Sequence, residues 1–389
     1  MRIVQVGLGG FGRNWAEEMI PQVTEVEVVG RADISPESRQ AAISAGVADP
    51  ATTYETAEEA IAATDPDAVL VTASLVGHVP AVRAALEAGK HVMTEKPFAP
   101  TVAEAAELVD LAESKGLVLA VSQNYRFFPA PQVARQLVAD GELGALHAVE
   151  LDFRRFSGTN GVRGPHHFLA EPLLVDMSIH HFDLMRVVLG RDPQQITCTT
   201  WDPEWSLFTG PSEGAALIDF GDVTLSYRGS WVSHGDPTPW AGAWRMDFEQ
   251  GEIAWTSRGD GRHGWLADEV WIRRGRQRTK LVLPTVDRTD RAAGGPAAVL
   301  DPVQGRARPV PDAVDVLRLL PVHEGQILLY RSHPGRQSYA YVLGGFAVVQ
   351  QVARVRPGVW QWRGGPALGV RAYLLLVPQS AGARVWVEL

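Results

Sequence analysis

The stretch Ile3-Val4-Gln5-Val6-Gly7-Leu8-Gly9-Gly10-Phe11-Gly12 decides how the first part of this chain folds. Its apolar start predicts a buried strand, and its glycines then follow the pattern G-x-G-x-x-G just before a helix expected over Arg13–Ile20. In such a turn Gly7 permits the tight bend, Gly9 lets the backbone approach a pyrophosphate, and Gly12 lets helix and strand pack closely. The free N–H groups at the helix N-terminus attract phosphate oxygens. The stretch therefore predicts a dinucleotide-binding turn.

An acidic residue follows at the distance that such a turn requires. A second strand is expected over Val26–Gly30, and Asp33 comes just after it, 21 residues beyond Gly12. A carboxylate in this place accepts hydrogen bonds from the hydroxyls of the adenosine ribose. It also repels a 2′-phosphate, which favours NAD over NADP. Arg31 and Arg13 leave NADP open as an alternative.

The first part of the chain alternates between extended and helical patterns. Strands are expected over Ala68–Thr72 and Leu117–Val121, and helices over Pro36–Gly46, Thr56–Ala63 and His78–Ala88. Thr101, with Glu104 three residues later, has the pattern of a capping box and begins a further helix. Alternation at this spacing predicts an α/β fold, a doubly wound parallel sheet over residues 1–122.

A lysine follows the next expected strand, in the stretch His91-Val92-Met93-Thr94-Glu95-Lys96-Pro97. Gly89 ends the preceding helix, and the apolar pair after His91 predicts a short buried strand. Ligands of open α/β sheets bind beyond the carboxyl ends of the strands, which is where Lys96 falls. Pro97 favours extended backbone at Lys96 and makes the bond between them a candidate for the cis form. Taken alone, these seven residues fit a surface lysine equally well.

The pattern changes after about Ser122. A helix over Pro131–Ala139, a half-exposed strand over His147–Arg155 and a long helix over Pro172–Leu189 are expected. Short strands follow over Ala215–Phe220, Val223–Gly229, Trp244–Phe248, Glu252–Thr256 and Glu269–Arg273. This order predicts a second, α+β domain with a mainly antiparallel sheet over residues 123–324.

The helix expected over Pro172–Leu189 brings three titratable side chains onto one face. Asp176 and His180 are four residues apart, and Asp183 is seven residues beyond Asp176. A carboxylate and an imidazole one turn apart can take or give a proton. An acid near a helix N-terminus and a buried histidine produce the same pattern, so both interpretations stay open. His181 lies about 100° around the helix and is expected to be structural.

In combination these motifs resemble the glucose–fructose oxidoreductase, inositol dehydrogenase and rhizopine-catabolism (Gfo/Idh/MocA) family, over roughly residues 1–315. The resemblance rests on the glycine-rich turn, on Ala88-Gly89-Lys90-His91-Val92 leading to Glu95-Lys96-Pro97, on Asn124-Tyr125-Arg126-Phe127 with Pro129, and on Asp176-Met177-Ser178-Ile179-His180 with Asp183. The family usually has glycine where this chain has Ser178, and small residues where it has Glu171-Pro172-Leu173. These departures bear on the choice of substrate more than on the chemistry.

The resemblance implies an NAD-dependent oxidoreductase that oxidises a secondary alcohol of a sugar or of a cyclic polyol such as inositol. It implies a catalytic set of Lys96, Asp176 and His180. The cofactor-binding residues that it implies are Gly7, Gly9, Gly10, Phe11, Gly12, Asp33, Thr72, His78, Glu95, Lys96 and Pro97. The substrate-binding residues are Tyr125, Arg126, Asp176 and His180. Two alternatives from other classes are an NAD-dependent glycosidase of the same family and a non-catalytic sugar or dinucleotide sensor.

The end of the chain departs from the family. Asp312-Ala313-Val314-Asp315 looks like the lead into the family's closing helix, yet no helical pattern follows. Residues 325–389 instead contain short apolar runs separated by glycine and proline. An additional β-rich module, a fusion and translation in a shifted frame all fit this atypical tail.

Bulk properties exclude several classes of protein. The chain has 389 residues, 46% of them hydrophobic, and a net charge of −9 without a basic run, which argues against a nucleic-acid partner. No apolar run reaches the roughly 18 residues that a membrane-spanning helix needs, and the N-terminus is typical of a core strand rather than a signal peptide. Cys198 is the single cysteine, so an internal disulfide is excluded and a cytoplasmic location is expected.

Two further expectations concern metals and assembly. His166 and His167, taken with Asp176 and His180, could be metal ligands, but their spacing matches no tight ligand pattern and no metal is expected. Eight of the 12 tryptophans lie between residues 201 and 271. Packing in the core or between subunits is their more common fate, stacking on a sugar the alternative. A homo-oligomer through the second-domain sheet is expected.

Overall fold

The computed structural model describes residues 1–23, 25–157, 161, 163–259 and 268–283, together with six short strands farther along the chain. The chain divides into two compact units. One comprises Met1–Asn124 and Thr285–His323, and the other Tyr125–Pro284 and Glu324–Leu389. The helix start expected at Asp312-Ala313-Val314-Asp315 lies outside the described residues.

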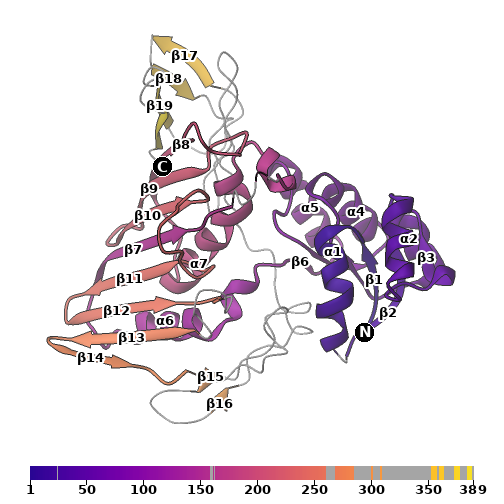
Figure 1. Cartoon of the computed structure of the whole chain (residues 1–389), viewed down its shortest axis with the longest axis horizontal. Coiled ribbons are helices and arrows are strands. Elements are labelled where there is room, and N and C mark those ends of the chain that lie inside the picture. The colour runs from indigo at the N-terminus through magenta and orange to yellow at the C-terminus, as the bar shows by residue number, and fades with distance from the viewer. Residues whose placement is uncertain are drawn as a thin grey trace. The chain divides into compact units, whose positions relative to one another are not determined.

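The first unit contains a six-stranded parallel sheet in the order β3-β2-β1-β4-β5-β6, which confirms the predicted doubly wound fold (Figure 1). Its strands are β1 (Arg2–Val6), β2 (Glu27–Ala32), β3 (Thr53–Tyr54), β4 (Ala68–Val71), β5 (His91–Thr94) and β6 (Leu119–Val121). Its helices are α1 (Gly10–Asn14), α2 (Pro36–Ser44), α3 (Ala57–Thr64), α4 (Leu75–Glu87) and α5 (Val102–Ser114). The strand order reverses between β1 and β4, and the carboxyl ends of such a pair are where α/β sheets bind ligands.

Helix α1 begins three residues earlier than expected. It starts at Gly10 and continues as a π-helical segment, Trp15–Met19, and a 3₁₀ turn, Ile20–Gln22. Gly12 therefore lies inside the helix. Glycine is required at this helical position for a steric reason. A Cβ on Gly12 would lie 2.2 Å from the backbone oxygen of Gly7, so only glycine lets the first helical turn pack against the strand end.

Local capping signals account for two other helix starts. At α5 the Thr101 hydroxyl accepts the Glu104 N–H and donates to the Glu104 carboxylate, which is a variant of the predicted box. A reciprocal capping box joins Thr56 and Glu59 at the start of α3.

The second unit is built on a twelve-stranded sheet in the order β14-β13-β12-β11-β7-β10-β9-β8-β20-β19-β18-β17. All its pairings are antiparallel except that of β7 with β10, which confirms the predicted mainly antiparallel sheet. The strands before residue 284 are β7 (Leu146–Arg154), β8 (Gln195–Trp201), β9 (Glu213–Asp219), β10 (Thr224–Ser230), β11 (Ala243–Phe248), β12 (Gly251–Thr256), β13 (Glu269–Arg274) and β14 (Gln277–Lys280). The later strands of this sheet are β17 (Val352–Arg356), β18 (Val359–Trp362), β19 (Ala372–Leu376) and β20 (Ala383–Val387), and β15 (Val299–Leu300) pairs with β16 (Ala307–Arg308) separately.

The two faces of this sheet differ in character. Helices α6 (Pro129–Asp140) and α7 (Ile179–Leu189) lie on one side of it (Figure 1). The hydrophobic core between these helices and the sheet includes the stacked pair Trp244 and Trp255. Cross-strand ion pairs occupy other positions of the strands: Arg228 with Asp152, Arg245 with Glu150, and Arg273 with Glu252. Each of these pairs joins residues directly opposite one another in register.

The long helix expected over Pro172–Leu189 is not uniformly α-helical. Pro172–Ser178 is π-helical, and α7 begins only at Ile179 and ends at Gly190 in the left-handed conformation. Asp176 therefore belongs to the π-helical segment and His180 to the α-helix. The expectation of a single regular α-helix was wrong, because the sequence pattern does not distinguish the two hydrogen-bonding schemes.

Gly12→Ala should destabilise the first unit, whereas Gly9→Ala should not. The added Cβ of Gly12→Ala meets backbone that cannot move without bending β1, and we expect a loss of about 1–3 kcal/mol. At Gly9 the φ is −78° and the nearest atom to an added Cβ is the Ser38 hydroxyl at 3.6 Å, so the loss should stay below about 1 kcal/mol. Thermal unfolding of both variants measures the difference, and equal losses would contradict this account.

Candidate functional site

The glycine-rich turn of the first unit reaches the surface at its middle. Gly7 and Gly12 are buried, whereas Gly9, Gly10 and Phe11 are exposed. Gly7 has a φ of +101° and a Cβ there would lie 2.3 Å from the Ala73 nitrogen, so the bend requires glycine. The exposed backbone of the turn is thus available to an anionic ligand at the start of the helix.

Large apolar side chains are exposed at the same edge of the sheet. Phe11 is 52%, Ile34 81% and Val76 80% exposed. They follow β1, β2 and β4, three neighbouring strands, at their carboxyl ends. Exposed apolar side chains around a polar turn fit a ligand with flat rings joined by phosphates.

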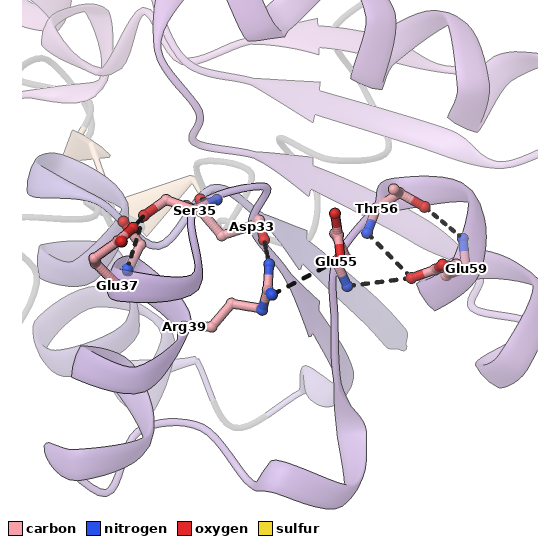
Figure 2. Close-up of polar contacts among 8 residues, drawn as sticks. Asp33, Ser35, Glu37, Arg39, Glu55, Thr56 and Glu59 are labelled. Atoms are coloured by element: carbon pink, nitrogen blue, oxygen red, sulfur yellow. Dashed lines mark hydrogen bonds and ion pairs between the residues drawn. The ribbon is translucent and has the colours of Figure 1, made fainter.

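Asp33 lies at the end of β2 and is tied to the glycine-rich turn. One carboxylate oxygen accepts the Leu8 N–H at 2.6 Å and the other accepts the Ser35 N–H at 2.8 Å. Each oxygen retains a second lone pair that can accept a ribose hydroxyl. Figure 2 shows Asp33 among the charged residues of the turns after β2 and β3.

Two buried side chains, Gln5 and Thr72, stabilise the glycine-rich turn by hydrogen bonds to its carbonyl groups. The Gln5 amide donates to the Gly12 carbonyl at 2.7 Å and to the Thr72 hydroxyl at 3.2 Å. The Thr72 hydroxyl in turn donates to the Gly7 carbonyl at 2.7 Å. Thr72, a predicted cofactor residue, therefore holds the shape of the turn, and Gln5 is a positioning residue that the sequence motif did not reveal.

The turn after β5 holds Lys96 next to a buried acid. The Lys96–Pro97 peptide bond is cis, as the sequence suggested. Glu95 is buried and its carboxylate accepts the Trp15 indole N–H at 2.9 Å and the Lys96 backbone N–H at 3.1 Å. Burial raises the pKa of Glu95, although the Lys96 charge and these hydrogen bonds oppose the rise. Trp15 thus links the helix of the glycine-rich turn to the lysine turn.

His78 fastens the other side of the lysine turn. Its Nδ1 lies 2.7 Å from the Pro97 carbonyl and its Nε2 lies 3.0 Å from the Ala73 carbonyl. Burial lowers the pKa of His78 in spite of these bonds, so the ring is neutral near pH 7 and donates one proton. His78 was a predicted cofactor residue, and here it joins the start of α4 to the turn that carries Lys96.

In the second unit His180 stacks on Tyr125. The ring centroids are 4.1 Å apart and the planes differ by 5°. His180 is 6% exposed and Tyr125 is also 6% exposed, so the orientation of the imidazole is fixed by packing. The Arg258 guanidinium lies 4.9 Å from the centre of the Tyr125 ring, a cation–π contact that helps to hold the stack. The structure thus brings together two residues that were predicted to bind substrate.

Arg126, predicted to bind substrate, forms an ion pair with Asp183. Its Nε donates to one carboxylate oxygen at 2.9 Å and its Nη2 donates to the other. Burial disfavours the charged guanidinium, but the charge of Asp183 and its hydrogen bonds raise the pKa of Arg126 above its ordinary value. This bidentate pair fastens the segment before α6 to α7. A substrate role for Arg126 stays a prediction.

Ser178, which stands where the family usually has glycine, belongs to a buried chain of hydrogen bonds. Its hydroxyl lies 2.6 Å from the Tyr227 hydroxyl, which lies 3.2 Å from His181 Nδ1. His181 Nε2 lies 2.9 Å from the Trp240 carbonyl. Burial lowers the pKa of His181 to about 4, so its neutral ring donates to Trp240 and accepts from Tyr227. The prediction that His181 is structural stays consistent with this chain, and Tyr227 is a residue that the sequence did not reveal.

No metal site is found in the part of the chain that the structure describes. His166 and His167 contact each other, and His167 stacks on Phe208 with ring centroids 4.4 Å apart. The Ser157 hydroxyl lies 2.8 Å from His166 Nε2. Among the described helices, none combines the length and the apolar character needed to cross a bilayer.

Glu95→Gln should change how the stability of the protein depends on pH. An acid whose pKa is raised by folding contributes stability below its ordinary pKa of 4.5, and this contribution is lost as the pH rises through the raised pKa. Glutamine cannot ionise, so the melting temperature of Glu95→Gln relative to the natural protein should increase from pH 5 to pH 8. The exposed Glu113→Gln is the matched control and should show no such trend. Parallel pH profiles for Glu95→Gln and the natural protein would contradict this expectation.

Tyr227→Phe should destabilise the second unit by about 2 kcal/mol, because it leaves the Ser178 hydroxyl and His181 Nδ1 buried without a partner. Ser178→Ala should cost less in the Tyr227→Phe background than in the natural protein, with a coupling on the order of 1 kcal/mol. Denaturant unfolding of the two single variants and the double variant measures this coupling. Additive effects would show that the hydroxyls do not act as a chain.

Comparisons with known proteins identify the family of the chain. Residues 1–123 match the sequence profile of the Gfo/Idh/MocA oxidoreductase family with its NAD-binding Rossmann fold, and residues 132–255 match the family's C-terminal domain. The protein y4oX of Sinorhizobium fredii is 27% identical over 64% of this chain and 71% of its own length. Inositol 2-dehydrogenase of Agrobacterium fabrum and 1,5-anhydro-D-fructose reductase of Ensifer adhaerens are each 31% identical over 49% of this chain. The chain spans 55% and 57%, respectively, of these two enzymes.

Solved structures share the fold at low sequence identity. An inositol dehydrogenase homologue from Azotobacter vinelandii, complexed with NAD⁺, has a TM-score of 0.62 at 20% identity and covers 82% of this chain and 84% of its own. An oxidoreductase from Agrobacterium radiobacter, in complex with NAD⁺, L-tartaric acid and magnesium, has a TM-score of 0.64 at 17% identity and covers 82% and 92%. With both domains of the family matched in order, the chain belongs to the Gfo/Idh/MocA oxidoreductases and its first unit is an NAD-binding Rossmann domain.

Proposed function

We propose that this chain is an NAD-dependent dehydrogenase that oxidises a secondary alcohol of a sugar or cyclic polyol. The observation that carries the proposal is His180, a buried imidazole whose orientation is fixed against Tyr125, on the α-helix that directly follows the π-helical segment of Asp176. A fixed imidazole suits proton transfer, because its ordinary pKa lies near the pH at which enzymes work. Relatives that act on an inositol and on an anhydro-sugar make a polyhydroxylated substrate the best-supported class.

The proposed roles follow from the chemistry of alcohol oxidation. When bound, NAD supplies the acceptor for the hydride. His180 takes the proton of the reacting hydroxyl, and Lys96 donates a hydrogen bond to the oxygen as negative charge develops on it. Asp176 accepts a hydrogen bond from a neighbouring hydroxyl of the substrate. Tyr125 adds an aromatic surface for the substrate, and Arg126 is a further proposed contact.

Lys96 is well supported as a functional lysine by its surroundings in the first unit. Glu95 and His78 fix the backbone on both sides of it, and Trp15 connects Glu95 to the glycine-rich turn. Such bracing is typical of a side chain that must keep its place relative to a bound cofactor. A surface lysine after a strand needs none of it.

Assembly and location are also proposed. Trp201 on β8 and Leu217 on β9 are 41% and 57% exposed, which supports a homo-oligomer through the sheet of the second unit. A cytoplasmic location stays a prediction that rests on the single cysteine.

The test is a screen of sugars and inositols for NAD reduction, followed by variants on the best substrate. His180→Ala should lower turnover by about 10²–10⁴-fold, the usual contribution of a general base. Lys96→Ala should raise the activation free energy by about 3 kcal/mol, and Lys96→Arg should not restore the rate, because a guanidinium is bulkier than an ammonium group. NAD affinity of His180→Ala should stay unchanged, because the glycine-rich turn and Asp33 lie in the other unit.

The same screen separates the alternatives. Net NADH formation supports the dehydrogenase, cleavage of a nitrophenyl glycoside without net NADH supports the glycosidase, and sugar binding without either supports the sensor. A His180→Ala variant that kept most of its turnover would remove His180 from the proposed role. Circular dichroism of each variant excludes loss of activity through unfolding.

A further inference from the structure

An arginine of the first unit contacts the backbone of Asp33, the residue expected to bind the adenosine ribose of a dinucleotide. Arg39 belongs to α2, and its Nη1 donates to the backbone oxygen of Asp33 at 2.6 Å. Its Nη2 lies 3.9 Å from a carboxylate oxygen of Glu55 (Figure 2). The guanidinium therefore lies beside the carboxyl end of β2, next to the carboxylate that marks the ribose site.

Glu55 is placed there by the neighbouring strand and helix. It directly follows β3, which pairs with β2 through Arg31 opposite Thr53 and Ala32 opposite Tyr54. Its backbone N–H donates to the carboxylate of Glu59 at 3.2 Å, within the capping box that starts α3. The backbone at Glu55 is thus anchored on both sides, and its side chain extends toward Arg39.

On the other side of the turn a second acid, Glu37, forms a hydrogen bond with the Ser35 hydroxyl. The Ser35 hydroxyl donates to Glu37 at 2.8 Å and accepts the Ser38 N–H at 3.1 Å. Hydrogen bonds from its own backbone N–H and from Ser35 lower the pKa of Glu37, so Glu37 is ionised near pH 7. The turns around the ribose site therefore present the carboxylates of Asp33, Glu37 and Glu55.

These contacts bear on the choice between NAD and NADP. The two cofactors differ by a 2′-phosphate on the adenosine ribose, and an arginine near this place is what accommodates that phosphate in NADP-binding folds. This chain has the arginine, but its charge is engaged by Glu55. We propose that Glu55 is a specificity-determining residue, which withholds Arg39 from a 2′-phosphate and adds its own repulsion to that of Asp33.

The proposal assigns separate roles to the two acids. Asp33 is the expected ribose contact, so its replacement should weaken the binding of NAD itself. Glu55 is 64% exposed in its side chain and Arg39 is 22% exposed, so their ion pair contributes little to the stability of the fold. Removing the charge of Glu55 should therefore leave NAD binding unchanged and free Arg39 for a phosphate.

The experiment is isothermal titration of the full chain with NAD, NADP and adenosine 2′,5′-bisphosphate. For Glu55→Gln we expect affinity for NADP and for the bisphosphate to rise by about three- to tenfold, with NAD affinity changed less than about twofold, in line with an exposed ion pair. The matched control is Glu58→Gln, which removes the same charge from an exposed position in the first turn of α3. It should raise NADP affinity by less than about twofold, because charges in solvent are screened.

A second variant keeps the proposal falsifiable. Arg39→Ala introduced into Glu55→Gln should abolish the gain in NADP affinity, because Arg39 is the proposed phosphate ligand. A gain that survives Arg39→Ala, an unchanged NADP affinity in Glu55→Gln, or an equal gain in Glu58→Gln would each overturn the proposal. Melting temperatures confirm that each variant is folded. The readout involves no substrate, so absence of sugar oxidation would leave this result intact.

Discussion

The contact between Gly12 and the carbonyl of Gly7 is the constraint on which the first unit depends. Because Gly12 has no side chain, the first turn of the helix rests directly on the end of β1, and a Cβ would lie only 2.2 Å from the Gly7 oxygen. Gln5 and Thr72 then bond to the carbonyls of the turn from inside the protein. Gly9, Gly10 and Phe11, in the middle of the turn, stay exposed, where a pyrophosphate can approach the backbone. The turn is thus shaped in advance by buried contacts, and binding a cofactor requires little further ordering of the backbone.

Buried polar groups connect the segments that carry the candidate site residues of each unit. Trp15 and Glu95 connect the helix of the glycine-rich turn with the turn of Lys96, although they are 80 residues apart. In the second unit the hydroxyl of Ser178, on the π-helical segment, meets the hydroxyl of Tyr227 on β10. A Cβ on Gly229 would lie 2.4 Å from the Tyr227 hydroxyl, so the glycine on β10 provides the room for that hydroxyl. Ser178, which departs from the family pattern, therefore has a hydrogen-bond partner in Tyr227, and its hydroxyl is not left unsatisfied in the core.

The proposed role of Glu55 illustrates how a weak ion pair would affect the choice of cofactor. Arg39 and Glu55 lie 3.9 Å apart and are both partly exposed, so their ion pair contributes little to the free energy of folding. The importance of the ion pair would be that it keeps Arg39 from binding a 2′-phosphate. A charge that is already paired attracts a ligand phosphate less than a charge in isolation, and the neighbouring acids repel it. Specificity can therefore be set by residues that need not touch the preferred ligand.

The sequence by itself determined the class of the fold and the local motifs. The glycines of the first turn, Asp33 after the second strand and Lys96 before Pro97 are signals that depend on neighbours a few residues away, so they can be read without a structure. The parallel sheet and the mainly antiparallel second sheet follow from the spacing of apolar residues in the same way. Strands β8 and β14 were missed because their exposed or half-buried residues do not alternate clearly between apolar and polar.

Only the tertiary structure decided which side chains support these motifs. The start of the first helix at Gly10, and the π-helical turn at Asp176, depend on hydrogen-bonding schemes that apolar periodicity does not distinguish. Gln5, Tyr227 and Glu55 gave no signal in the sequence, because their partners come from strands and helices that are distant along the chain or that meet only when the sheet forms. A motif specifies a local backbone shape, whereas a contact between distant residues depends on the register of the whole sheet, and that register is determined by the packing of the entire unit.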